Sequence, residues 1–280
     1  MIYTEKQILH YTNSSSRKLD ENIGQYQLTN KIQKCLEQFS PVSLLQMKKV
    51  KLMTRTDRKF VVPANLLPDL LSAVASFYKV QQIDQKRIAT YATVYYDTPD
   101  YFFYHAHVKG KLNRTKIRIR QYVDSDLSFL EIKNKNNKGV TNKIRIQART
   151  VDNNNLSFLE QHVSVVNPKN LTPSLNNKFQ RITLVNHQFT ERLTIDFNII
   201  VKNCRENNEA AIPNLCIIEV KQSHPAPTPL ISFLKYYHIR ASGLSKYCLG
   251  ISITTNDVKK NNYKPKIHFL QKRLNHDLFC

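Results

Sequence analysis

Charged side chains recur at every second residue along five segments of this 280-residue chain, at 55–59, 116–120, 131–135, 143–145 and 219–221. A β-strand points residues i, i+2 and i+4 to one face of its sheet. The intervening positions are largely apolar, as Ile117 and Ile119 illustrate. The pattern therefore predicts a sheet with one apolar face and one face rich in Lys and Arg.

Many strands and few helices are expected from the remaining periodicity. Strands are predicted near 53–62, 88–96, 115–122, 128–135, 142–150, 178–186, 189–199, 215–222 and 245–254. Helices are predicted at 66–77 and 229–239, with a partly helical stretch at 28–39. Because about eight strands can close on themselves, we expect an all-β or α+β barrel.

Composition divides the chain into three parts. Residues 1–40 are polar and form an N-terminal extension, residues 41–254 carry the periodic segments of one domain, and residues 255–280 form a basic C-terminal tail. Residues 151–177 are rich in Asn and Pro and are expected to leave the sheet.

The formal net charge of +21 indicates that the partners of this protein are anionic. Such a field attracts nucleic acid, phosphate chains or an anionic membrane surface. No nucleic-acid partner is expected, since no helix-turn-helix, RNP or zinc motif accompanies the charge. Five cysteines without a CxxC pair favour reduced thiols, and no apolar stretch indicates a secretion signal or a membrane helix. We expect a cytoplasmic protein, whose basic tail could dock at the inner face of the membrane.

Alternating charges on a single strand most often form a solvated surface. Here basic residues dominate strand after strand, and like charges on neighbouring strands repel each other unless an anion lies between them. We therefore expect the charges to line a barrel or groove. Carboxylates in that setting, at Glu131, Asp196 and Glu219, are either counter-ions or ligands that hold Mg²⁺ or Mn²⁺ against phosphate.

The chain has no P-loop and no nucleophile elbow. If the protein is an enzyme, catalysis must come from positioning a phosphoryl group and stabilising its charge.

Six blocks of sequence in one order resemble a known family. They are PVSLLQMKKVKLMTRTDRKFVV (41–62), YYDTPDYFFYHAHVKGKLNRTKIRIRQY (95–122), FLEIKNK (129–135), ERLTID (191–196), CIIEVK (216–221) and LSKYCLGI (244–251). Together they resemble the VTC domain, the polyphosphate polymerase domain of vacuolar transporter chaperone proteins, in a stand-alone bacterial form. That domain belongs to the triphosphate tunnel metalloenzyme, or CYTH-like, superfamily. The resemblance implies an α+β fold: a closed antiparallel β-barrel tunnel of about eight strands with a few flanking helices.

The resemblance also implies roles for individual residues. Those expected to contact phosphate in the tunnel are Lys59, Arg118, Arg120, Lys133, Lys143, Arg145, Arg181, Lys221 and Lys246. Glu219 matches the metal-binding glutamate, with help from Glu131 or Asp196, and the expected cofactor is Mn²⁺ or Mg²⁺. The expected substrates are ATP and inorganic polyphosphate, with metal-dependent transfer of the terminal phosphate of ATP to the growing chain.

Two other functions stay open for the same fold. One is hydrolysis of tripolyphosphate or nucleoside triphosphates, ranked lower because such hydrolases often carry an ExExK first strand, whereas Arg55, Asp57 and Lys59 alternate here. The other is a non-catalytic polyphosphate-binding module that acts with a membrane-protein partner.

Overall fold

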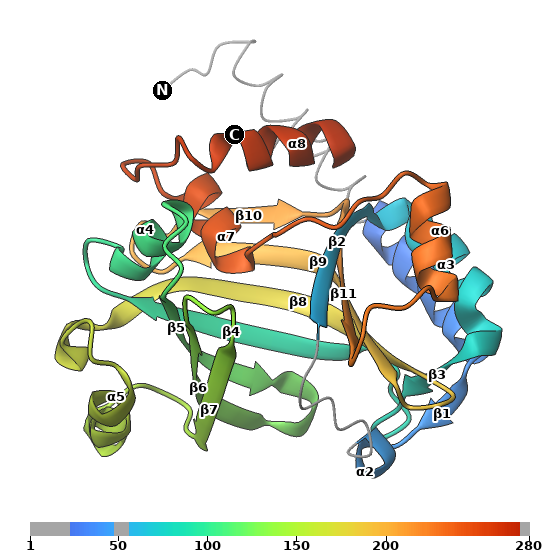
Figure 1. Ribbon diagram of the computed structural model, residues 1–280, viewed down its shortest axis with the longest axis horizontal. Coiled ribbons are helices and arrows are strands. Elements are labelled where there is room, and N and C mark those ends of the chain that lie inside the picture. Colours follow the sequence, from blue (N-terminus) through green and yellow to red (C-terminus); the bar gives the residue numbers. More distant parts are fainter. Residues whose placement is uncertain (1–22, 48–55, 275–280) are drawn as a thin grey trace, which may run out of the picture.

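The computed structural model describes residues 23–47 and 56–274, and Figure 1 shows the arrangement of its elements. Residues 23–37 are helical. The elements that follow are β1 (Ser40–Val42), α2 (Leu44–Met47), β2 (Thr56–Pro63), α3 (Leu67–Val74), β3 (Tyr78–Gln81), β4 (Ala89–Asp97), α4 (Phe102–Val108), β5 (Arg114–Tyr122), β6 (Leu127–Lys135), β7 (Thr141–Gln147), α5 (Leu156–His162), β8 (Thr172–Asn186), β9 (Glu191–Asn203), β10 (Glu209–Ile212), β11 (Leu215–Gln222), α6 (Pro229–Tyr236), α7 (Lys246–Thr254) and α8 (Lys264–Leu274).

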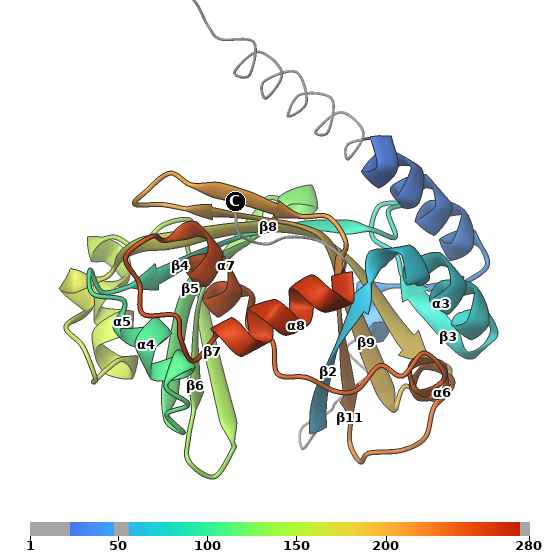
Figure 2. The same ribbon diagram turned by 90° about the horizontal axis from the view of Figure 1, so that it is seen from above.

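One strongly curved sheet organises the molecule (Figure 2). Its main path runs β2-β11-β9-β8-β4-β5-β6-β7, with every neighbouring pair antiparallel. β10 pairs antiparallel with the end of β9, β3 pairs with the end of β8, and β1 pairs with β3 in parallel. The predicted α+β class and antiparallel sheet are confirmed.

The predicted closure into a barrel is wrong. In the ladder formed by the described residues, β2 and β7 are the two ends of the path and are not paired with each other. The outer edge of β2 instead meets a later segment: Phe60 bridges to Ala241, and the Ser242 N–H donates to the Lys59 carbonyl at 2.8 Å. The other edge, β7, is an exposed strand carrying Lys143 and Arg145, which discourages pairing at a free edge.

Apolar side chains on the convex side of the sheet are buried against helices. The helix at 23–37, α3 and α6 cover β2, β9 and β11 through residues such as Leu70, Leu230 and Ile218. α4 and α5 cover β5 and β6 through residues such as Phe103 and Ile132. These clusters hold the two arms of the curved sheet in place.

The predicted last strand at 245–254 is wrong, because these residues form α7. Ser245 caps the helix by accepting from the Cys248 N–H at 3.2 Å. Nearly every residue of α7 is buried, so its sequence shows no helical period. Gly250 permits the close approach, since a Cβ there would lie 2.4 Å from Leu175 Cδ2 of β8.

α7 and α8 fill one end of the concave side of the sheet (Figure 2). α8 lies within the segment expected to be a basic tail, and it buries Ile267 and Leu270 completely or almost so. No helix in the ranges 23–47 and 56–274 is both long enough and apolar enough to cross a membrane.

Candidate active site

The strand register gathers the predicted charged residues on the concave face. Glu219 lies opposite Lys59 on one side, and Arg118 lies opposite Glu131 on the other. We define the cationic face as the following residues: Lys59, Lys116, Arg118, Arg120, Lys133, Lys143, Arg145, Arg181, Lys221 and Lys246, together with Glu131, Asp196 and Glu219. All twelve residues singled out from the sequence belong to it, and Lys116 is added.

Glu131 is the most buried carboxylate of the cationic face, at 1% exposure. It accepts from Arg118 Nε at 2.9 Å through Oε2 and from Lys143 Nζ through Oε1. Burial alone would raise the pKa of Glu131, but Arg118, Arg120 and Lys143 lower it to about 2. The carboxylate therefore stays charged and ties β5 to β7.

Asp196 joins the sheet to α7. Arg181 donates to it from two nitrogens, Nε to Oδ1 at 2.5 Å and Nη2 to Oδ2 at 2.8 Å. Lys246, the first residue of α7, donates to the same Oδ2. Burial would raise the pKa of Asp196, yet the two cations hold it well below its usual range.

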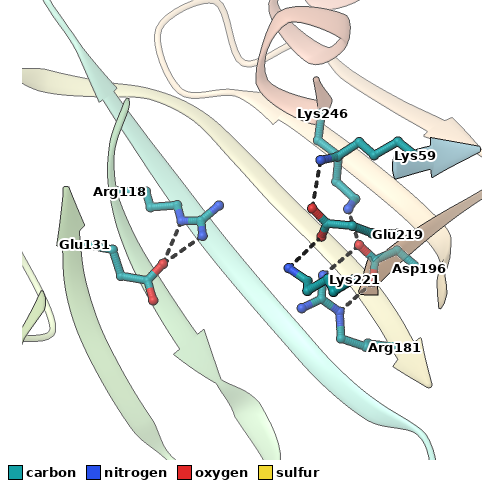
Figure 3. A network of polar contacts seen from close by, with 8 residues as sticks. All are labelled: Lys59, Arg118, Glu131, Arg181, Asp196, Glu219, Lys221 and Lys246. Atoms are coloured by element: carbon teal, nitrogen blue, oxygen red, sulfur yellow. Dashed lines mark hydrogen bonds and ion pairs between the residues drawn. The ribbon is translucent and has the colours of Figure 1, made fainter. Parts of the chain in front are cut away.

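Glu219 is the most accessible carboxylate of the three, with 18% of its side chain exposed. Lys59 Nζ contacts its Oε1 at 2.9 Å and Lys221 Nζ contacts its Oε2 at 3.2 Å. The pKa of Glu219 lies below its usual range, because these lysines outweigh the effect of burial. Figure 3 shows Glu219 and Asp196 on one arm of the sheet and the Arg118–Glu131 pair on the other.

Two side chains of the cationic face, Arg120 and Lys133, carry positive charges that nearby carboxylates offset only in part. Arg120 is 9% exposed, its Nε has no hydrogen-bond partner among the described residues, and its guanidinium lies 5.7 Å from the Tyr91 ring centroid. Burial, with Arg118 and Arg181, lowers the pKa of Arg120 to about 10. Burial and the nearby Lys59 lower the pKa of Lys133 to about 8.

The cationic face as defined has ten cations and three carboxylates, an excess of seven positive charges. Asp57 and Arg192, both opposite Lys221 in the ladder, add one charge of each sign and leave that excess unchanged. Holding this many like charges together is costly unless an anion joins them. The face therefore suits a ligand with several negative charges, such as a chain of phosphates.

The cationic face also contains aromatic rings that the sequence patterns did not lead us to predict. Arg181 lies 4.8 Å from the Tyr91 ring centroid, Lys246 lies 4.3 Å from that of Phe179, and Tyr95 stacks on Tyr247 at 4.9 Å. The alternation of Tyr91, Thr93 and Tyr95 in β4 is the signal that could have found them. These rings hold the cations in position.

The donor set fits a single-carboxylate metal site. The described residues contain no group of three or more His, Cys, Asp or Glu side chains that could hold a metal ion. Mg²⁺ usually keeps several waters and uses one or two carboxylates together with substrate phosphates. Glu219 fits that role best, because Glu131 and Asp196 are more deeply buried.

Comparison with known sequence families finds a match over most of the chain. The VTC domain, as a sequence family, matches residues 54–255. The chain belongs to the VTC domain family. The match spans every strand of the main path, and α7 ends just inside it. No curated protein matches the chain.

Several solved structures are similar to this VTC domain. A protein from Vibrio parahaemolyticus proposed to be an adenylate cyclase is 13% identical, with 69% of this chain and 95% of that chain covered and a TM-score of 0.42. One from Bacillus halodurans with the same proposed activity is 10% identical, with coverage of 72% and 98% and a TM-score of 0.44. An adenylyl cyclase candidate from Hippeastrum, described as having a dominant triphosphatase activity, is 16% identical, with coverage of 72% and 97% and a TM-score of 0.42.

Proposed function

We propose that this protein is a metal-dependent polyphosphate polymerase that transfers the terminal phosphate of ATP to a growing inorganic polyphosphate chain. The observation that carries the proposal is the excess of seven positive charges on the cationic face. A transfer between two phosphates brings two polyanions into one site. Its transition state concentrates negative charge, which a preorganised set of cations stabilises.

The carboxylates favour a phosphate nucleophile over water. Each carboxylate of the cationic face contacts two cations, and its pKa lies below the usual range. A carboxylate in that state is a weak base and would not readily take a proton from water. A phosphate end group needs no such activation, because it is already an anion at neutral pH.

In the proposed reaction, each arm of the curved sheet binds part of the substrates. Arg118, Arg120 and Lys133 hold the triphosphate of ATP from one arm of the sheet, and Lys59 and Lys221 hold it from the other. An oxygen of the chain end forms a bond to the terminal phosphorus, the bridging P–O bond breaks, and ADP leaves with the electron pair. Mn²⁺ or Mg²⁺ at Glu219 would neutralise charge on the phosphate oxygens.

Incubation with ATP, Mn²⁺ and a trace of pyrophosphate tests the proposal. We expect a polyphosphate ladder on a gel for the wild-type protein, and its loss in Lys133→Ala and Glu219→Gln. Lys178→Ala is a matched control, because Lys178 lies on β8 with Arg181 but is exposed on the opposite face.

Other outcomes decide against the polymerase. Release of free phosphate without a ladder would make the protein a triphosphatase. Tight tripolyphosphate binding without any turnover would make it a binding module that needs a partner, such as a membrane protein.

A further inference from the structure

α8 has one buried side and one exposed side. The helix lies along the margin of the molecule in Figure 1, beyond α7. It packs on β2 and on the neighbouring apolar cluster through Ile267, Leu270 and Leu274, which are buried. Since residues three and four apart share one side of a helix, these three side chains define the inner side. We define the outer face of α8 as four exposed residues on the opposite side: Lys264, His268, Phe269 and Lys272.

The segment that contains α8 is basic throughout. Residues 258–274 include six Lys or Arg residues and no Asp or Glu. Among the residues that the structure describes, no carboxylate forms an ion pair with Lys264 or Lys272. Lys266 differs, because its Nζ donates to the Gly243 carbonyl at 2.7 Å and so turns back toward the protein. The positive charge of the outer face therefore faces solvent, where it attracts anionic partners.

Phe269 distinguishes between the anionic partners that this charge could attract. It is 49% exposed, and it lies one helical turn from both Pro265 and Lys272. A soluble polyanion such as polyphosphate has no apolar surface to cover the ring. The boundary between the headgroups and the acyl chains of a bilayer does, and Phe is among the residues that enter it from surface helices. An exposed ring among lysines therefore favours a lipid surface.

The lysines of the outer face suit the same surface. Their apolar stems can lie beside a ring that enters the bilayer boundary while their charged ends stay at the level of the lipid phosphates. Attraction between basic side chains and anionic lipids acts only within about one Debye length of the surface. Binding through so few groups should therefore be reversible and weakened by salt.

We propose that the outer face of α8 docks this protein on a membrane surface that contains anionic phospholipids. Phe269 enters the layer of headgroups, and Lys264 and Lys272 contact the lipid phosphates. The outer face shares no residue with the cationic face, so docking does not depend on the proposed function.

A single fluorescent reporter tests the contact. The chain contains no tryptophan, so Phe269→Trp places the only indole at the proposed surface. We expect its emission to shift to shorter wavelength with vesicles of phosphatidylglycerol and phosphatidylcholine, and to stay unchanged with phosphatidylcholine alone. Tyr236→Trp is the matched control, because Tyr236 is a 78% exposed ring on another surface helix, α6. Its emission should not shift with either kind of vesicle.

Co-sedimentation with the same vesicles at physiological ionic strength measures the affinity. Lys264→Gln and Lys272→Gln should each weaken binding about fivefold, as expected for one basic residue at an anionic surface. Lys178→Gln, an exposed change on β8, should stay within about twofold of wild type, because charges far from the bilayer are screened. Lys133→Ala should also stay within about twofold, because the cationic face takes no part in docking.

Three results would overturn the proposal. The first is an unchanged emission of the Phe269→Trp variant with anionic vesicles, and the second is an equal shift with neutral vesicles. The third is a loss of vesicle binding in Lys133→Ala as large as in Lys272→Gln, which would mean that the cationic face binds the lipid phosphates.

Discussion

At the scale of single residues, Arg120 is expected to lower the folding stability of the ligand-free protein and to strengthen anion binding. The guanidinium is buried, no described carboxylate lies within ion-pair distance of it, and the attraction of Glu131 offsets only part of its desolvation. Its neighbours in the cationic face, Arg118 and Arg181, repel it. Such a residue costs folding free energy and is useful only when an anion binds.

We therefore expect Arg120→Met to stabilise the ligand-free protein by about 1–4 kcal/mol, because a buried charge is replaced by an apolar side chain of similar length. The same change should weaken tripolyphosphate binding roughly 10- to 100-fold, through loss of charged hydrogen bonds. Urea unfolding and calorimetry measure the two effects. A variant that is less stable than wild type would show that Arg120 already has a compensating partner.

The lowered pKa of Lys133 predicts that folding stability and ligand binding both depend on pH. Its pKa of about 8 lies below the ordinary lysine value of about 10.4, so the unfolded chain binds more protons between these two values. The stability of the ligand-free protein should rise with pH across that window. A bound polyanion favours the charged lysine, so binding near pH 8.5 should take up protons.

Calorimetry in two buffers with different ionisation enthalpies measures this uptake. The difference between wild type and Lys133→Ala isolates the lysine from the ligand's own protons. Equal proton exchange in the two proteins would contradict the prediction.

At the scale of elements, α8 supports the site from a distance. It packs on β2, its Ile267 and Leu270 lie in the same apolar cluster as α7, and α7 carries Lys246 to Asp196. The apolar contacts of a segment that looks like a tail therefore support the helix that carries Lys246.

Leu270→Ala should cost about 2–5 kcal/mol of stability, because it opens a cavity between α8 and the sheet. Phe269→Ala is the matched control, since Phe269 is its neighbour in α8 and 49% exposed, and should change stability by less than about 0.5 kcal/mol. Urea unfolding compares the two variants. Equal effects would mean that α8 does not pack as described.

At the scale of the whole molecule, the curved sheet holds two charged arms facing each other without hydrogen bonds between β2 and β7. A polyanion that contacts both arms should act as a link between them. We expect tripolyphosphate at 100 times its Kd to add about 2.7 kcal/mol of stability, seen as a rise in Tm. Potassium chloride at equal ionic strength is the control. An equal rise with the salt would show charge screening instead of a specific link.

The period-2 alternation in the sequence identified the strands that carry Arg118, Glu131 and Glu219, and hence one face for their side chains. That succeeded because side-chain direction in a strand is a local property of the backbone. The same reasoning failed at 245–254, where a helix buried on nearly all sides leaves no period to detect.

The order of residues along the chain was enough to predict the charged strands, the antiparallel α+β class and the membership of the VTC domain family. The pairing of the charges could be seen only in the folded molecule, since Asp196 and Lys246 meet through packing that no spacing encodes. Tertiary contacts also decided that the sheet stays unclosed between β2 and β7, because Ala241 and Ser242 occupy the edge of β2. Local patterns set the direction of each side chain, whereas partners and edges depend on contacts between distant parts of the chain.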